Sequence, residues 1–260
     1  MTKKVQKKLI IMNWKMSPST LREAKGLISI LKTKHLIPNT EIVVCPPFEY
    51  LSDVAGLINK TKIKLGGQNV FYKDRGAYTG EISPKMLKNL GVKYVIIGHS
   101  ERRAMGETDG IINKKVIAAL KDGLKVILCV GEQARGKAQG AKREAEKTIK
   151  EQLQKDLKGI GNWKLEIGNL AIAYEPIWAI SSNKNAEQDT PKDAAEMSKF
   201  IKKYLKSYFL NLKSAPVLYG GSVNSKNVLD FIKQKEINGA LVGHASVDKK
   251  ELTKILNKLE

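Results

Sequence analysis

The sequence lacks the features that define several classes of protein. No stretch of its 260 residues approaches the roughly 18 consecutive apolar residues that a membrane-spanning helix needs. Only two cysteines occur, Cys45 and Cys129; both sit in apolar runs without metal-ligand spacing, so we expect buried, reduced thiols. The basic segment Met1 to Lys8 has no apolar signal region and no small-residue cleavage site, which predicts a cytoplasmic protein. No cluster of potential ligands is visible, so we expect neither a metal nor an organic cofactor.

Acidic residues are few relative to basic ones. The chain has 46 Lys and Arg against 26 Asp and Glu, a formal net charge of +20. Such a charge is compatible with a nucleic acid or an anionic surface as partner. However, no basic tract is interleaved with aromatic residues, and no zinc-finger, RNP or helix-turn-helix pattern occurs. The lysines are dispersed over different predicted helices, for example in the pairs Lys32 and Lys34, Lys114 and Lys115, Lys202 and Lys203, and Lys249 and Lys250. We interpret them as solvated helix faces and expect no specific nucleic acid and no membrane as partner.

Short apolar runs alternate with segments of helical period. The runs are rich in Val, Ile and Leu and cover Lys8–Met16, Glu41–Pro47, Lys62–Val70, Tyr94–Ser100, Lys125–Glu132, Leu170–Trp178, Ala215–Val223 and Ile237–Val247. Most are continuously apolar at their centres, which is typical of parallel strands covered on both faces. The helical segments are Pro18–Lys34, Thr108–Lys121, Ala141–Leu157 and Pro191–Leu212. In Thr108–Lys121, one apolar stripe is expected to comprise Ile111, Ile112, Val116, Ala119 and Leu120.

Eight strands that alternate with helices, with no linker between halves, predict one domain of residues 1–260. We expect an α/β fold, a single-domain (β/α)8 TIM barrel. A doubly wound open sheet is the alternative. It usually has fewer strands, and no G-x-G-x-x-G follows the first strand here.

Polar and glycine-rich residues gather where the predicted strands end. These segments are Asn13–Lys15, Gln68–Asn69, Gly98–Arg102, Tyr174–Pro176, Gly220–Ser222 and Gly243–His244. In a (β/α)8 barrel the carboxyl ends of the strands meet at one face, where active sites are built. The sequence therefore predicts one pocket that contains a carboxylate, an imidazole, an ammonium group, an amide and glycine-rich turns. Glycine turns after the last two strands, opposite Lys15, indicate a phosphate site built from backbone N–H groups.

Six segments resemble the signature segments of triosephosphate isomerase, in the same order. They are N-W-K from Asn13, G-H-S-E-R-R from Gly98, C-V-G-E from Cys129, A-Y-E-P-I-W-A-I from Ala173, Y-G-G-S-V from Tyr219 and G-A-L-V-G from Gly239. The resemblance runs from about Lys8 to the C-terminal helix. It implies an isomerase of glycolysis and gluconeogenesis, which interconverts dihydroxyacetone phosphate and D-glyceraldehyde 3-phosphate through an enediolate.

The resemblance also implies a role for each residue of the pocket. Glu175 would be the base that moves a proton between neighbouring carbons, and His99 the electrophile that hydrogen-bonds to the carbonyl. Lys15 would pair with the phosphate and the enediolate charge, with Asn13 orienting it and Glu101 as its partner. The implied substrate contacts come from Asn13, Lys15, Ser181, Ser222, Gly243 and His244. Cys129 and Glu132 are expected to serve packing and support of the lid.

A loop from Gly76 to Ser83, G-A-Y-T-G-E-I-S, resembles the loop that forms the family's dimer. It implies a homodimer in which Thr79 enters the neighbouring subunit beside Asn13 and His99. The alternative is a mobile surface loop of a monomer.

Two departures from the family's pattern lie near the expected phosphate site. The lid usually continues with Gly-Thr-Gly-Lys, whereas here it reads Ser181-Ser182-Asn183-Lys184, and His244 stands where the family more often has glycine. Our hypothesis is an active enzyme with altered lid closure and phosphate affinity. Two alternatives remain open: an isomerase of another phosphorylated sugar, and a catalytically weakened barrel scaffold that binds polyanions.

Overall fold

The eight strands of the computed structural model are short and almost wholly buried. The structure describes residues 7–33, 37–134, 140–160, 169–181, 186–209, 212 and 214–260. Its strands are β1 (Lys8–Asn13), β2 (Thr40–Cys45), β3 (Lys64–Gly67), β4 (Tyr94–Ile97), β5 (Lys125–Val130), β6 (Leu170–Tyr174), β7 (Val217–Tyr219) and β8 (Gly239–Val242). All the strands are parallel, and each pairs with the next one along the chain. The barrel closes where β8 pairs with β1, with Gly239 opposite Leu9. The predicted (β/α)8 TIM barrel is confirmed, whereas the extent of the single domain, residues 1–260, stays a prediction.

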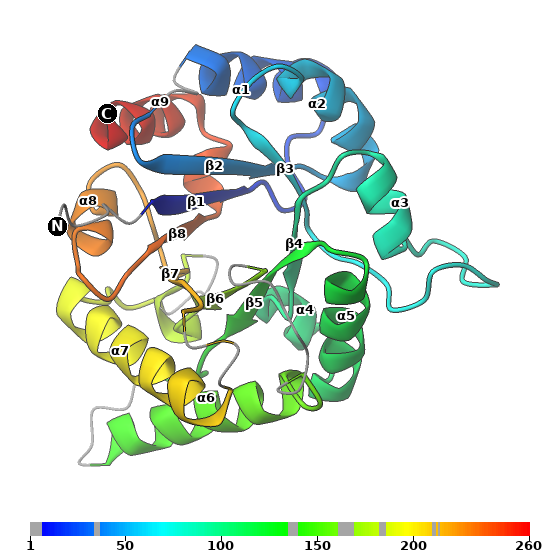
Figure 1. Ribbon diagram of the computed structural model, residues 1–260. Coiled ribbons are helices and arrows are strands. Elements are labelled where there is room, and N and C mark those ends of the chain that lie inside the picture. The colour runs from blue at the N-terminus through cyan, green and yellow to red at the C-terminus, as the bar shows by residue number, and fades with distance from the viewer. Residues whose placement is uncertain are drawn as a thin grey trace, which may run out of the picture.

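Helices surround this barrel on the outside (Figure 1). They are α1 (Leu21–Thr33), α2 (Leu51–Ile58), α3 (Pro84–Asn89), α4 (Ser100–Ala104), α5 (Asp109–Lys121), α6 (Ala141–Asp156), α7 (Pro191–Tyr208), α8 (Val228–Ile232) and α9 (Lys249–Leu259). In the described part of the chain, short 3-10 turns follow β2, β6 and β8: η1 (Phe48–Tyr50), η2 (Ile177–Ala179) and η4 (His244–Ser246). Among the described residues, no helix is long and apolar enough to cross a membrane.

Strand residues pack alternately on two sides of the sheet. Leu9 and Ile11 of β1 face the barrel interior, where they join Val43, Cys45 and eight further side chains from the other strands. Ile10 and Met12 face outward and pack under the helices. Both faces are therefore apolar, which explains why the strands read as continuous hydrophobic runs. Cys45 and Cys129 are buried free thiols, as expected.

Two expectations for α5 are wrong. Ile111 was expected in the apolar stripe, but it is 36% exposed. The position that faces the core one turn later belongs to Lys115, which was expected on a solvated face and is only 3% exposed. Its ammonium group pairs with Glu107 and donates to Asn69, so the cost of burying the charge is offset. Burial lowers the pKa of Lys115, and Glu107 opposes that shift.

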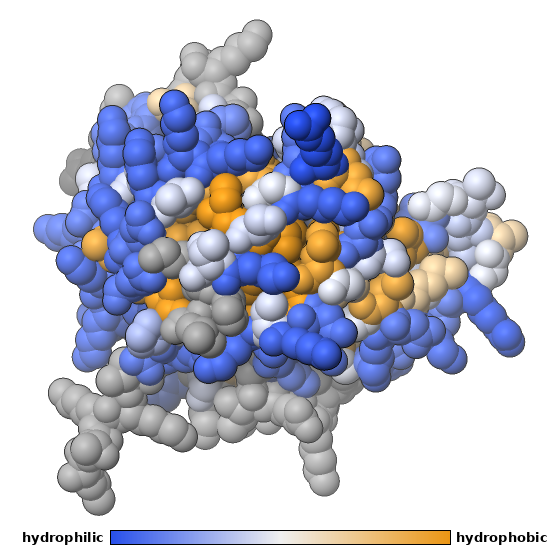
Figure 2. All heavy atoms as spheres, turned by 90° about the horizontal axis from the view of Figure 1, so that it is seen from above, coloured by the Kyte–Doolittle hydropathy of each residue, from blue (hydrophilic) through white to orange (hydrophobic). Residues whose placement is uncertain are grey.

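Hydrophilic side chains cover most of the face shown in Figure 2, around a hydrophobic centre. On this face the hydrophilic side chains lie all round that centre and are not confined to one side of it. Lys34 and the expected lid residues Ser182–Lys184 lie outside the described residues.

Candidate active site

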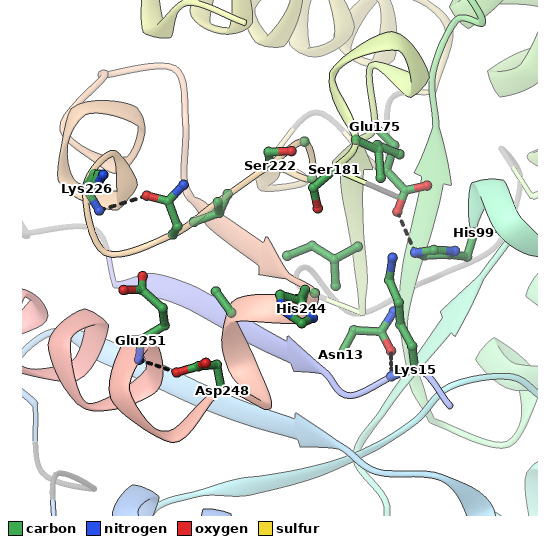
Figure 3. Close-up of a pocket in the computed structure, with 18 residues that line it drawn as sticks. Asn13, Lys15, His99, Glu175, Ser181, Ser222, Lys226, His244, Asp248 and Glu251 are labelled. Carbon is green, nitrogen blue, oxygen red and sulfur yellow. Dashed lines mark hydrogen bonds and ion pairs between the residues drawn. The ribbon is translucent and has the colours of Figure 1, made fainter. Parts of the chain in front are cut away.

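A pocket of about 320 Å³ lies at the carboxyl ends of the strands (Figure 3). Of the catalytic residues and substrate contacts that the resemblance implies, it brings together eight: Asn13, Lys15, His99, Glu175, Ser181, Ser222, Gly243 and His244. Glu101 does not line it but borders an adjoining pocket together with Lys15 and His99. Residues from β1, β4, β6, β7 and β8 thus meet in one place, as closure of the barrel requires.

Glu175 follows β6 directly and is 2% exposed. Its backbone N–H donates to the carbonyl of Val130 over 2.8 Å, which continues the pairing of β6 with β5. Its Oε2 accepts a hydrogen bond from the backbone N–H of Ser100 at 2.9 Å. Gly220 of the next loop leaves room for it, because a Cβ at this position would lie 2.9 Å from Cγ of Glu175. The carboxylate is therefore buried but held at the wall of the pocket.

His99 caps the N-terminus of α4. Its Nδ1 accepts from the backbone N–H of Glu101 at 3.2 Å, so this nitrogen carries no proton. A neutral ring then has its proton on Nε2. That nitrogen lies 3.3 Å from Oε1 of Glu175. The cap fixes the tautomer that presents an N–H donor to the pocket.

Lys15 has a left-handed backbone conformation with φ of 54°. This conformation is costly for a residue other than glycine, and two side chains stabilise it. Asn13 accepts from the N–H of Lys15 at 3.0 Å, and Gln68 donates to its carbonyl at 2.8 Å. The ammonium group is 2.6 Å from Glu101. The sequence placed Gln68 at the end of a strand but did not reveal its role, which depends on Lys15, a residue 53 positions away.

The turns after β7 and β8 form the opposite side of the pocket. Ser222 donates both its N–H, at 3.1 Å, and its hydroxyl, at 2.7 Å, to the carbonyl of Ala179 in η2. Its donors therefore hold η2 next to the turn after β7. Gly243 lies against Lys15: a Cβ there would be 3.1 Å from Cε of the lysine. His244 begins η4 and is exposed at the pocket's wall.

Glu132 anchors η2 from the other side. Its Oε1 accepts from the hydroxyl of Tyr174 at 2.9 Å and from Nε1 of Trp178 at 2.7 Å. Burial raises the pKa of Glu132, and these hydrogen bonds act in the opposite direction. Glu132 and Ser222 thus hold η2 from two sides, through Trp178 and Ala179.

Four residues at the pocket's far end had no signal in the sequence. They are Asn224, Lys226, Asp248 and Glu251. Asp248 caps α9 by accepting from the N–H of Glu251, whose carboxylate accepts from the N–H of Ser225 at 3.0 Å. No group of three His, Cys, Asp or Glu side chains in the described part of the chain is arranged to hold a metal ion.

Comparison with known proteins gives one consistent result. Residues 8–259 match the family model described as triosephosphate isomerase. The protein of that name from Finegoldia magna is 43% identical over 256 residues, which cover 97% of this chain and 99% of the relative. That from Thermoanaerobacter pseudethanolicus is 43% identical over 256 residues, 97% of this chain and 100% of the relative. That from Aquifex aeolicus is 41% identical over 254 residues, 96% and 98% of the two chains. The similarity therefore extends from β1 to α9.

Proposed function

The chain belongs to the triosephosphate isomerase family and interconverts dihydroxyacetone phosphate and D-glyceraldehyde 3-phosphate in glycolysis, and we propose that Glu175 is its base. The alternative of a polyanion-binding scaffold is not favoured, because the match extends over nearly the whole chain. The observation that best supports this proposal is that Glu175 and His99 line the same pocket. Oε1 of Glu175 lies 3.3 Å from Nε2 of His99.

Glu175 removes the proton from carbon 1 of dihydroxyacetone phosphate, next to the carbonyl. The electrons of the broken C–H bond form the carbon–carbon double bond of an enediolate, and the carbonyl oxygen takes up the negative charge. A proton then passes from the hydroxyl oxygen on carbon 1 to the oxygen on carbon 2. As the protonated Glu175 returns its proton to carbon 2, the oxygen on carbon 1 forms the carbonyl of the aldehyde. A carboxylate suits both transfers, because its two oxygens reach neighbouring carbons from one side.

His99 and Lys15 stabilise the charge that develops on the substrate oxygen. His99 contributes the Nε2–H that its cap presents to the pocket. Lys15 contributes a positive charge, and Asn13 and Gln68 hold its backbone in place. Preorganised donors of this kind need no rearrangement when charge develops in the transition state. Glu101 positions the ammonium group through its 2.6 Å ion pair.

The phosphate binds on the side of η4 and the β7 turn. Gly243 and His244 offer backbone N–H groups there, and Ser181 lies across the pocket from them. Ser222 joins them only after its N–H leaves the carbonyl of Ala179. Binding of phosphate at Ser222 and release of η2 are therefore coupled in this proposal.

We also propose a homodimer formed through the loop Gly76–Ser83. This segment, between β3 and α3, projects away from the barrel in Figure 1. Tyr78 packs on Phe71 with ring centroids 4.8 Å apart, which supports the loop internally. The pocket beside Lys15 and His99 measures about 330 Å³ and is bordered by Met16 and Met105, which are 97% and 73% exposed. Exposed apolar side chains around such a pocket are typical of a protein interface.

Sedimentation of the parent and of Thr79→Arg tests the dimer, because a charged side chain at the loop's tip would be buried in the partner. We expect a dimeric parent and a largely monomeric variant; a monomeric parent would overturn this part of the proposal. Action in the cytoplasm stays a prediction from the sequence.

A coupled assay of glyceraldehyde 3-phosphate isomerisation tests the base. Glu175→Asp shortens the side chain by one methylene group, so its carboxylate is displaced from the substrate carbons. We expect kcat to fall by on the order of 100-fold, since small displacements of reacting groups cost that much. Glu49→Gln, at an exposed position outside the pocket, is the control. Equal kcat values for Glu175→Asp and the parent would show that Glu175 is not the base.

A further inference from the structure

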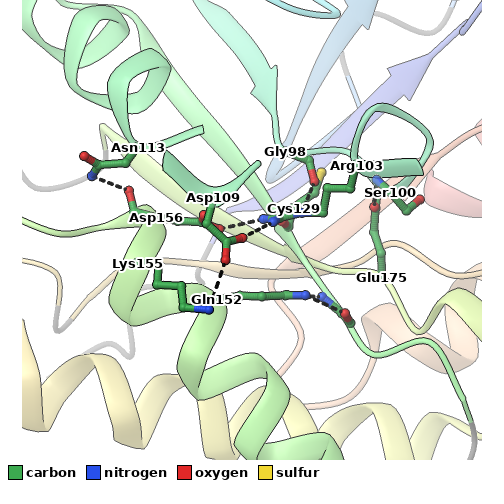
Figure 4. A network of polar contacts seen from close by, with 11 residues as sticks. Gly98, Ser100, Arg103, Asp109, Asn113, Cys129, Gln152, Lys155, Asp156 and Glu175 are labelled. Atoms are coloured by element: carbon green, nitrogen blue, oxygen red, sulfur yellow. Dashed lines mark hydrogen bonds and ion pairs between the residues drawn. The ribbon is translucent and has the colours of Figure 1, made fainter. Parts of the chain in front are cut away.

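A charged cluster lies behind the active site, centred on Arg103 of α4 (Figure 4). The side chain of Arg103 is largely buried, with 14% of its surface exposed. It uses three nitrogens to contact two backbone carbonyls and two carboxylates. None of these groups lines the pocket, so the reaction described above leaves the cluster without a role.

Both carbonyls belong to segments that carry the reacting groups. Nε of Arg103 donates to the carbonyl of Gly98 at 2.8 Å, and Nη2 donates to that of Cys129 at 3.1 Å. Gly98 immediately precedes His99, and Cys129 immediately precedes Val130, whose carbonyl accepts the backbone N–H of Glu175 at 2.8 Å. Arg103 therefore holds the backbone next to the electrophile and the backbone next to the base.

Close approach at Gly98 is possible only because it is glycine. Its φ is 73°, and a Cβ would lie 3.0 Å from Nη2 of Arg103. α4 has only five residues, so an anchor at Arg103 fixes the helix that begins at Ser100. The N–H of Ser100 in turn donates to Oε2 of Glu175 at 2.9 Å. A shift of the guanidinium would thus reach both reacting side chains.

Asp156, the last residue of α6, forms an ion pair with the guanidinium group of Arg103. Its Oδ2 lies 2.6 Å from Nη2, the same nitrogen that holds the carbonyl of Cys129. The side chain is completely buried, and its backbone carbonyl accepts from Asn113 at 2.9 Å. The other carboxylate, Asp109, contacts Nη1 at 2.7 Å and is partly exposed. Nη1 donates to no backbone carbonyl. Of the two carboxylates, only Asp156 therefore contacts Nη2, the nitrogen that donates to the carbonyl of Cys129.

Stability is a poor explanation for Asp156. Burial raises its pKa to about 7, Asp109 acts in the same direction, and Arg103 and Lys155 oppose the shift. No described group hydrogen-bonds to its Oδ1. Buried ion pairs often contribute no more to stability than apolar side chains of similar size. A residue whose charged form is disfavoured in the fold is better explained by what it positions.

We propose that Asp156 is a positioning residue of the isomerase reaction, which fixes Arg103 beneath the carbonyls of Gly98 and Cys129. The proposal rests on the proposed roles of His99 and Glu175. The groups that face Asp156 are Arg103 from α4, Asp109 from α5 and Lys155 from α6. When Asp156 is ionised, its charge holds Nη2 in place; when it is neutral, the guanidinium is free to shift toward Asp109 and the solvent.

The test compares kcat of the parent and of Asp156→Asn from pH 5.5 to pH 8.5. Asparagine has the size of neutral aspartic acid but never ionises. We expect equal kcat values at pH 5.5, and at pH 8.5 a kcat for the variant lower on the order of tenfold, with KM unchanged. Asp109→Asn is the matched control: it removes the other carboxylate, and we expect less than about a twofold change in kcat at either pH.

Three outcomes contradict the proposal. A kcat ratio that is the same at all pH values would leave Asp156 a structural residue. An equal loss in Asp109→Asn would make the cluster's total charge, and not Asp156, the cause. Failure of Asp156→Asn to fold at pH 5.5, checked by circular dichroism, would show that the carboxylate serves stability. An inactive parent would instead overturn the proposed function, so the two failures are distinguishable.

Discussion

Nε2 of His99 and Oε1 of Glu175 lie 3.3 Å apart, although the two residues follow different strands, β4 and β6. The backbone sets this distance from both sides. The N–H of Glu101 fixes the ring, and the N–H of Ser100 holds the carboxylate. Both donors belong to the first residues of α4, so one helix N-terminus orients the base and the electrophile.

Replacing His99 by glutamine removes the ring donor but keeps a polar side chain. We expect kcat to fall by about 10²- to 10³-fold, the typical cost of losing a preorganised donor to an oxyanion. KM should change little, because the interaction strengthens mainly in the transition state. Steady-state kinetics in both directions measure this; a rise in KM with an unchanged kcat would assign His99 to substrate binding alone.

Gly220→Ala tests whether the position of Glu175 depends on space left by a glycine. The new Cβ would lie 2.9 Å from Cγ of Glu175, so the base must move. We expect kcat to fall on the order of tenfold or more. Gly56→Ala is the matched control, since nothing lies within 4 Å of its Cβ in the middle of α2. It should leave kcat unchanged and stabilise the fold by about 0.5–1 kcal/mol. Similar kcat values for both variants would contradict the expected contact.

The free energy of unfolding should depend on pH through Asp156. The carboxyl group ionises near pH 3.8 in the unfolded chain and near pH 7 in the folded protein. Between these values the folded state binds more protons, so the stability falls as the pH rises toward 7. We therefore expect Asp156→Asn to gain stability relative to the parent from pH 5 to pH 8, measured by urea unfolding. A difference that is constant with pH would contradict the raised pKa.

Restoring Gly-Thr-Gly at positions 181 to 183 tests the departure in the lid. A serine or an asparagine is penalised wherever the closed lid needs a left-handed backbone, and glycine is not. We expect kcat to change, with the fold and its thermal midpoint nearly unaffected. Identical kinetics for the restored variant and the parent would show that the substitutions do not influence closure.

The sequence predicted the barrel and the location of the pocket because both depend on local patterns. Strand ends are marked by Lys15, His99, Glu175 and Gly243, and closure of the barrel brings such ends together. The burial of Lys115 was not predicted, because its partner Glu107 lies outside the helical period that was read. The pairing of Arg103 with Asp156 was equally invisible: it spans 53 positions and depends on where α6 ends. Hydrogen bonds between elements that are distant in the sequence depend on how those elements pack. A pattern along the chain does not contain this information.

Exchange of the carbon-bound proton tests the central claim most directly. Dihydroxyacetone phosphate is incubated in D2O with the parent or with Glu175→Gln, which keeps the side chain's size but is not a base. Proton NMR then measures the incorporation of deuterium as the loss of the proton signal at the carbon to which Glu175 returns the proton. The account predicts deuterated product with the parent and almost none with Glu175→Gln, even though inorganic phosphate still binds the variant. Undiminished exchange in the folded variant would show that another group is the base.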